Sequence, residues 1–150
     1  MKRISCNVRV RFRDLDALGH VNYAVYLTYL EEAFTALWRE VLRRVGRELS
    51  AGELGCVVAR TEIDYLFAAL LGQELEVKVW VESVGSSSFT TAYEVSTAGG
   101  DQKIARARTV QVVTLKNEAG KPMPEEIKSA LSASGAPGTN HRGEESEDSL

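Results

Sequence analysis

The chain has 150 residues, of which 44% are hydrophobic and 26% are charged, and its formal net charge is −3 at pH 7. This size and composition indicate one globular domain and do not fit collagen-like, membrane-spanning or fully disordered classes. The negative net charge excludes a global basic field, so we expect no nucleic-acid partner. No apolar run is long enough for a membrane span or a secretory signal, and we therefore expect a cytoplasmic protein.

Cysteines and histidines are few and widely separated. Cys6 and Cys56 do not form a CxxC pair, and the histidines are His20 and His141. A structural zinc site needs four such ligands at suitable spacing, and a disulfide framework needs more cysteines. The sequence therefore predicts two free thiols, no metal ion and no cofactor.

The first part of the chain predicts one strand followed by one long helix. Hydrophobic and polar residues alternate over residues 6–13, as in a strand with one buried face. A polar turn over residues 14–21 leads to Asn22, a residue type favoured at helix N-caps. Apolar residues then recur at helical spacing from residue 23 to about 45, where Gly46 can end the helix. They cover well over half of its circumference, so other elements should wrap around this helix.

The rest of the chain predicts more strands. Four segments without helical periodicity cover residues 56–65, 74–84, 88–96 and 103–115. Short turns join the last three, which should form an antiparallel meander. A short helix over residues 124–131 should follow, and the Ser-, Gly- and Glu-rich residues 132–150 should form a disordered tail. We thus predict one α+β domain over residues 1–131, with a five-stranded antiparallel sheet wrapped around one long helix.

Chemically active side chains concentrate in the turn before the helix. They are Asp14, Asp16, His20, Asn22, Tyr23 and Tyr26, grouped around Gly19. A carboxylate beside a helix N-terminus can bind and attack an electrophilic carbonyl group, because the first N–H groups of a helix are unpaired. By residue type alone, both aspartates are typical turn-capping residues, and Asn22 is most simply a helix cap. His20 fits an acid–base role and a structural role equally well.

A family resemblance gives these residues more specific roles. The turn DLDALGHVNYAVYL (residues 14–27), the long helix and the meander GQELEVKVWVESVGSSSF (residues 72–89) resemble the hot-dog fold acyl-CoA thioesterases of the hydroxybenzoyl-CoA thioesterase type. The likeness covers about residues 4–128. It rests on the Asp-x-x-Gly spacing, on an aromatic residue ten positions after the second aspartate, and on the order of the strands. The resemblance implies a hot-dog fold and hydrolysis of an acyl-CoA thioester to a free acid and CoA.

The resemblance also implies individual roles. Asp16 would be the catalytic carboxylate, acting as the nucleophile or as the base for a water molecule. The backbone N–H of Tyr23 would polarise the thioester oxygen, which agrees with the general argument from helix N-termini. This chain has Tyr23 where many members have Asn or His. His20 is the third candidate catalytic residue, and the candidate substrate contacts in the same turn are Gly19, Asn22 and Tyr26.

Members of the family assemble as dimers or tetramers, with the acyl-CoA site between two subunits. The resemblance therefore implies a homodimer or homotetramer with interfacial active sites. In such an assembly the strand over residues 56–65, with Val58 and Arg60, would line the neighbouring site. Ser87, in the first turn of the meander, would lie near bound CoA.

Two alternatives remain open from the sequence. The chain could be a non-catalytic hot-dog module that binds acyl-CoA or acyl-carrier protein as a sensor or scaffold, although such a sensor would more naturally carry a fused DNA-binding domain. It could also be a hot-dog dehydratase, but those enzymes normally pair a histidine with a carboxylate on the helix. The presence of Asp16 together with Gly19 favours the thioesterase.

Overall fold

The computed structural model describes residues 3–49 and 53–135. Within them, five strands form one antiparallel sheet. In spatial order the strands are β1 (Ile4–Arg9), β3 (Glu74–Val84), β4 (Ser88–Thr97), β5 (Lys103–Leu115) and β2 (Leu54–Tyr65). The predicted meander is thus the middle of the sheet, and β1 and β2 are its two edges.

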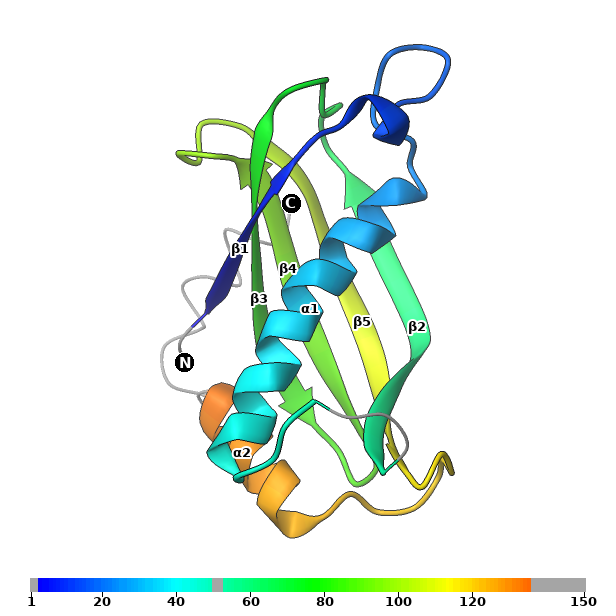
Figure 1. Ribbon diagram of the computed structural model, residues 1–150, viewed down its shortest axis with the longest axis vertical. Helices are drawn as coiled ribbons and strands as arrows, with labels where there is room; N and C mark the ends of the chain where they lie inside the picture. Colours follow the sequence, from blue (N-terminus) through cyan, green and yellow to red (C-terminus); the bar gives the residue numbers. More distant parts are fainter. Residues whose placement is uncertain (1–2, 50–52, 136–150) are drawn as a thin grey trace.

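The long helix α1 (Val25–Arg44) crosses one face of the sheet, and α2 (Glu125–Gly135) packs near its C-terminal end (Figure 1). The side chains that α1 buries recur every three or four residues and therefore share one side of the helix. They are Tyr26, Tyr29, Leu30, Ala33, Leu37, Trp38, Val41 and Leu42. Gly46, with φ at +72°, follows the end of the helix as predicted. In the part of the chain that the structure describes, no helix combines the length and hydropathy needed to cross a bilayer.

The core lies between α1 and the sheet. Alternate residues of β3 and β4 contribute buried side chains: Leu75, Val77, Val79, Val81, Phe89, Tyr93 and Val95. The rings of Phe34, Trp38 and Phe89 stack on one another, with centroids 6.0 to 6.4 Å apart. Full burial of one such side chain stabilises the fold by about 1.5–3 kcal/mol. The predicted α+β architecture, with the sheet around one long helix, is confirmed.

Four polar side chains are also buried in this core. They are Thr91 and Tyr93 on β4 and Thr109 and Gln111 on β5, and none is more than 5% exposed. The three hydroxyl oxygens lie 2.6 to 3.1 Å from one another, and the amide nitrogen of Gln111 donates to Thr109 at 3.2 Å. Because each hydroxyl has a partner within the group, the network offsets the cost of removing these groups from water.

The first strand is shorter than predicted. Hydrophobic alternation continues to residue 13, but β1 ends at Arg9 and Phe12–Asp14 form a single 3₁₀ turn. The reason is local, because the Asp14 carboxylate accepts a hydrogen bond from the Arg11 N–H at 3.0 Å. A side chain that bonds the backbone in this way competes with strand pairing.

Both helices also differ from the predicted boundaries. Asn22 is not the N-cap, because α1 begins at Val25, and Tyr23 precedes the helix instead of lying in its first turn. The second helix α2 continues to Gly135, so residues 132–135, predicted as the start of the tail, are helical. Residues 136–150 of the predicted tail lie outside the described residues.

Candidate active site

The acidic turn folds back on itself between β1 and α1. The Asn22 N–H donates to the Asp14 carbonyl at 2.8 Å, and the Asp16 N–H donates to the His20 carbonyl at 2.7 Å. A second segment lies alongside, because the Val21 N–H donates to the Ala69 carbonyl at 3.1 Å. Val21 is buried, whereas Asp16 and His20 are exposed. The turn is thus a short antiparallel hairpin that presents its acidic and imidazole groups to solvent.

The carboxylate of Asp16 is held by only one of its oxygens. Its Oδ1 atom accepts the Leu18 N–H at 2.8 Å and the His20 N–H at 3.2 Å. The tight return needs Gly19, whose φ of +83° is strained for any residue with a Cβ atom. Among the hydrogen bonds of residues 3–49 and 53–135, none engages Oδ2 of Asp16. One oxygen fixes the side chain, and the other is available for chemistry.

The N–H of Tyr23 is a donor without an acceptor in the described part of the chain. Asn22 satisfies the next two N–H groups: its side-chain oxygen accepts from Ala24 at 2.9 Å, and its carbonyl accepts from Val25 at 2.9 Å. On the other side of the residue, the Tyr65 hydroxyl donates to the Tyr23 carbonyl at 2.7 Å. The Tyr23 N–H therefore lies just before the positive end of the α1 dipole, on a fixed backbone.

Three tyrosines and Asp14 support this loop. The buried Tyr26 hydroxyl accepts the Ala69 N–H at 3.2 Å, and the Tyr26 ring meets those of Tyr29 and Tyr65 edge-on at 5.9 and 5.2 Å. The Tyr29 hydroxyl donates to Asp14 at 2.8 Å. Burial, reinforced by this carboxylate, raises the pKa of Tyr29 above its ordinary value. Asp14 therefore has a structural role.

Sequence reasoning missed two of these supports. Tyr29 had a local signal, since it lies three residues after Tyr26 and so on the same side of the helix. Tyr65 had none, because it ends β2 and meets Tyr23 only through the fold. For His20, the backbone takes part in the hairpin, and its imidazole makes no hydrogen bond within the described residues.

The remaining predicted residues lie far from Asp16 in one chain. Val58 precedes the Tyr65 end of β2 by seven residues, or about 20 Å of extended chain. Arg60 forms an ion pair with Glu62. Ser87 lies in the turn between β3 and β4, at the end of β3 opposite the one that pairs with Arg9. A single chain therefore groups Asp16, Gly19, His20, Asn22, Tyr23 and Tyr26 but separates them from Val58, Arg60 and Ser87.

Exposed apolar side chains surround the loop and continue along β2. They are Phe12, Leu18, Tyr23, Leu27, Val57, Val58, Tyr65, Phe67, Leu70 and Leu71, which are between 46% and 81% exposed. β2 is an edge strand of twelve residues, and no other strand of the described residues pairs with its outer side. A long apolar edge of this kind is a typical site of pairing with another chain.

The groups available for chemistry in this loop are a carboxylate, an imidazole and backbone N–H groups. Across residues 3–49 and 53–135, no three His, Cys, Asp or Glu side chains gather as metal ligands would. Both cysteines are free thiols, and burial raises the pKa of Cys56 to about 12. That thiol is therefore almost entirely protonated at neutral pH and is a poor nucleophile.

The sheet around α1 and the acidic loop before it define the class of the protein, a hot-dog fold of the thioesterase type. A family model described as "Thioesterase-like superfamily" matches residues 10–131. The chain belongs to this superfamily. The predicted fold and the predicted enzyme class, a thioester hydrolase, are therefore confirmed.

Individual relatives agree with this assignment. The "Acyl-CoA thioesterase YbgC" of Haemophilus influenzae is 33% identical over 126 residues, which cover 83% of this chain and 90% of that protein. The "1,4-dihydroxy-2-naphthoyl-CoA hydrolase" of Synechococcus elongatus is 27% identical over 128 residues, which cover 81% of this chain and 90% of that protein. Among solved structures, a thioesterase from Thermus thermophilus complexed with coenzyme A and Zn is 34% identical, with a TM-score of 0.75. The match covers 89% of this chain and 94% of that one.

Proposed function

We propose that the protein hydrolyses an acyl-CoA thioester to a free carboxylic acid and CoA. The observation that carries this proposal is the occurrence, in one loop, of a carboxylate oxygen on Asp16 and an N–H on Tyr23 that have no hydrogen-bond partner among residues 3–49 and 53–135. A nucleophile or base beside a donor for the developing oxyanion is the arrangement that acyl transfer requires. Relatives whose names specify CoA thioesters support the choice of substrate class.

In the proposed reaction, the thioester carbonyl oxygen accepts a hydrogen bond from the Tyr23 N–H. The Asp16 oxygen then either attacks the carbonyl carbon, giving an anhydride that water hydrolyses, or takes a proton from the water that attacks. In both routes the carbon–sulfur bond breaks and CoA leaves as a thiolate. The exposed His20 imidazole, next to Asp16 in the hairpin, is the candidate proton donor to that sulfur.

A second copy of the chain would complete this site. Two β2 edges that pair antiparallel about a two-fold axis place the N-terminal half of each strand beside the Tyr65 end of the other. Val58 and Arg60 of one copy would then approach the Asp16 loop of the other, which a single chain does not allow. The exposed apolar side chains along β2 would be covered. We therefore infer a homodimer through β2 with interfacial active sites.

The Val58→Asp variant tests this interface. A buried, unpaired carboxylate within the β2 contact opposes pairing, so we expect the assembly mass to halve in analytical ultracentrifugation and the thioesterase activity to fall with it. Leu49→Asp is the matched control, because Leu49 is exposed to a similar degree, 49% against 57%, but lies outside β2. An unchanged mass for the Val58 variant would remove β2 from the interface.

The acyl group is the remaining part of the proposal. The side chains of Tyr23, Tyr65 and Phe67, which are 74%, 48% and 58% exposed, offer aromatic surface near the Asp16 loop. We therefore propose an aromatic acyl group over an aliphatic one.

Release of CoA thiol across a panel of acyl-CoAs tests both the activity and this preference. The panel runs from acetyl through long-chain to benzoyl, hydroxybenzoyl and 1,4-dihydroxy-2-naphthoyl thioesters. We expect turnover, with the highest kcat/KM for an aromatic member. Saturable acyl-CoA binding without thiol release would instead indicate the non-catalytic sensor, and reversible hydration of an enoyl thioester would indicate the dehydratase.

A further inference from the structure

The proposed oxyanion donor lies on a peptide whose direction is fixed by short-range hydrogen bonds. A trans peptide points its N–H and its C=O in opposite directions. The Asn22 carbonyl, which shares a peptide with the Tyr23 N–H, accepts from the Val25 N–H at 2.9 Å. The following peptide is held through its N–H, because Ala24 donates to the Asn22 side chain at 2.9 Å. These bonds join residues at most three positions apart, so they shape the turn but do not place it against the sheet.

A long-range hydrogen bond connects the same backbone to β2. Tyr65 is the last residue of β2, and its hydroxyl donates to the Tyr23 carbonyl at 2.7 Å, across 42 positions of sequence. This carbonyl belongs to the peptide between Tyr23 and Ala24, whose N–H is already bonded. With the peptides on both sides of Tyr23 held, its φ and ψ have little freedom. The Tyr23 N–H is thereby placed relative to the sheet as well as within the turn.

The Tyr65 side chain is itself held by the sheet and by a buried ring. Its main chain pairs with Ala105 of β5, and its ring meets the Tyr26 ring edge-on at 5.2 Å. Tyr26 is buried, and its hydroxyl accepts the Ala69 N–H at 3.2 Å. Partial burial raises the pKa of Tyr65 above its ordinary value, so the hydroxyl keeps its proton at neutral pH. Tyr65 is therefore a donor of fixed position at the pH where the enzyme works.

We propose that Tyr65 is a positioning residue for thioester hydrolysis, whose hydroxyl holds the Tyr23 peptide so that the Tyr23 N–H meets the developing oxyanion. A preorganised donor stabilises the transition state because it does not have to reorient as charge develops. The Tyr65 hydroxyl acts through the main chain, and its ring stays available to the acyl group. This inference rests on the proposed function, in which the Tyr23 N–H is the oxyanion donor, and extends it to a residue outside the loop.

The Tyr65→Phe variant tests this role because it removes the hydroxyl and keeps the ring. Loss of the hydrogen bond to the Tyr23 carbonyl should lower kcat by about 3- to 10-fold. KM should stay unchanged, since the aromatic surface is retained. Tyr93→Phe is the control, because it removes a hydroxyl from the buried network of β4 and β5 and should lower the thermal unfolding midpoint without lowering kcat. A wild-type kcat in the Tyr65 variant, or an equal loss of kcat in both variants, would overturn the proposal.

A double-mutant cycle identifies the group through which Tyr65 acts. Tyr23→Pro removes the N–H that Tyr65 is proposed to position. In that background, Tyr65→Phe should therefore cause no further loss of kcat. Independent effects would multiply instead, so a double variant whose loss equals the product of the two single losses would show that Tyr65 does not act through the Tyr23 N–H.

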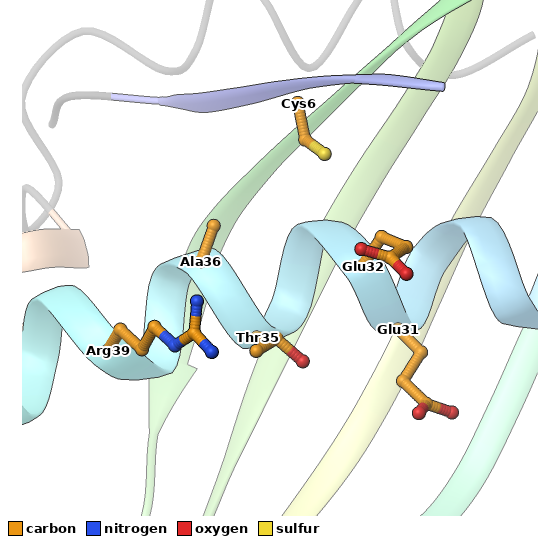
Figure 2. Close-up of a pocket in the computed structure, with 6 residues that line it drawn as sticks. All are labelled: Cys6, Glu31, Glu32, Thr35, Ala36 and Arg39. Atoms are coloured by element: carbon orange, nitrogen blue, oxygen red, sulfur yellow. The ribbon is translucent and has the colours of Figure 1, made fainter. Parts of the chain in front are cut away.

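The pocket between β1 and α1 provides a control for the place where the substrate binds. It has a volume of about 440 Å³ and is lined by Cys6, Glu31, Glu32, Thr35, Ala36 and Arg39 (Figure 2). None of the residues that hold the Tyr23 peptide lines it. Ala36→Leu narrows this pocket, and we expect kcat and KM to stay unchanged. A loss of activity in this variant would place the substrate away from the loop, where Tyr65 does not act on the reaction.

Amide hydrogen exchange measures the contact without catalysis. Tyr65→Phe should speed exchange at the Ala24 amide, which shares a peptide with the Tyr23 carbonyl, and leave the amides of β3 unchanged. Faster exchange at Ala24, with no thiol release by the wild type, would support the hydrogen bond and contradict the proposed function. Thiol release by the wild type, with exchange and kcat unchanged in the Tyr65 variant, would do the reverse.

Discussion

The Asp16→Asn substitution is expected to lower the kcat of thioester hydrolysis by about 10²–10⁴-fold and to leave the wild-type fold intact. The physical reason is that an amide oxygen is neither a useful nucleophile nor a base. The loop itself should persist, because the Asn carbonyl oxygen can still accept the Leu18 and His20 N–H groups that Oδ1 of Asp16 accepts now. The substitution therefore separates the chemical role of Asp16 from its role in the turn.

The measurement is the rate of CoA thiol release at saturating substrate, together with the thermal unfolding midpoint. Asp101→Asn is the matched control, since it makes the same substitution at an exposed turn between β4 and β5. Wild-type unfolding with wild-type turnover in the Asp16 variant would exclude this carboxylate from the mechanism. Lost turnover with retained acyl-CoA binding is the expected pattern.

The Tyr23→Pro variant is expected to lower kcat by about 10²–10³-fold, the usual cost of removing one oxyanion donor. Proline deletes the backbone N–H at this position and nothing else on the main chain. The N–H has no acceptor in the described part of the fold, so its removal breaks no hydrogen bond there. An Asn–Pro sequence suits the start of a turn, and Asn22 can keep its hydrogen bond to the Ala24 N–H.

Tyr23→Ala is the control for this second experiment. It removes the exposed phenol ring but keeps the N–H, so we expect most of kcat to survive and any change to fall mainly on KM. The contrast between the two variants assigns the effect to the main chain or to the side chain. Equal turnover in the Pro and Ala variants would show that the Tyr23 N–H does not stabilise the transition state.

The regular strands and helices could be predicted because the spacing of hydrophobic residues along each segment determines its secondary structure. β3 occupies the predicted residues 74–84, since hydrophobic alternation there is uninterrupted and one face is buried along most of its length. The end of β1 could not be predicted in this way. Phe12 continues the alternation but is 81% exposed, because the Asp14 side chain bonds the Arg11 backbone and turns the chain. A hydrogen bond between a side chain and the backbone outweighed the periodic signal.

In the candidate site, too, residues in local contact could be predicted from the sequence, whereas contacts between distant residues could not. Asp16, Gly19 and His20 could be named from sequence because they lie within one turn, where spacing determines proximity. The contact between Tyr65 and Tyr23 joins residues 42 positions apart, and no local pattern reports it. Asn22 does precede the helix but is not its N-cap, since its side chain bonds the Ala24 N–H and α1 begins only at Val25.

The buried hydroxyl network of β4 and β5 constrains how this protein can change over generations. Replacing Thr109 alone by an apolar residue removes a partner that Thr91, Tyr93 and Gln111 share and leaves the hydroxyls of Thr91 and Tyr93 bonded only to each other. A buried polar group that loses its last partner costs about 1–3 kcal/mol. Replacing the whole group by apolar side chains of similar shape can be nearly neutral. Substitutions at these positions are therefore epistatic, so descendants of this chain should keep the network whole or lose it whole.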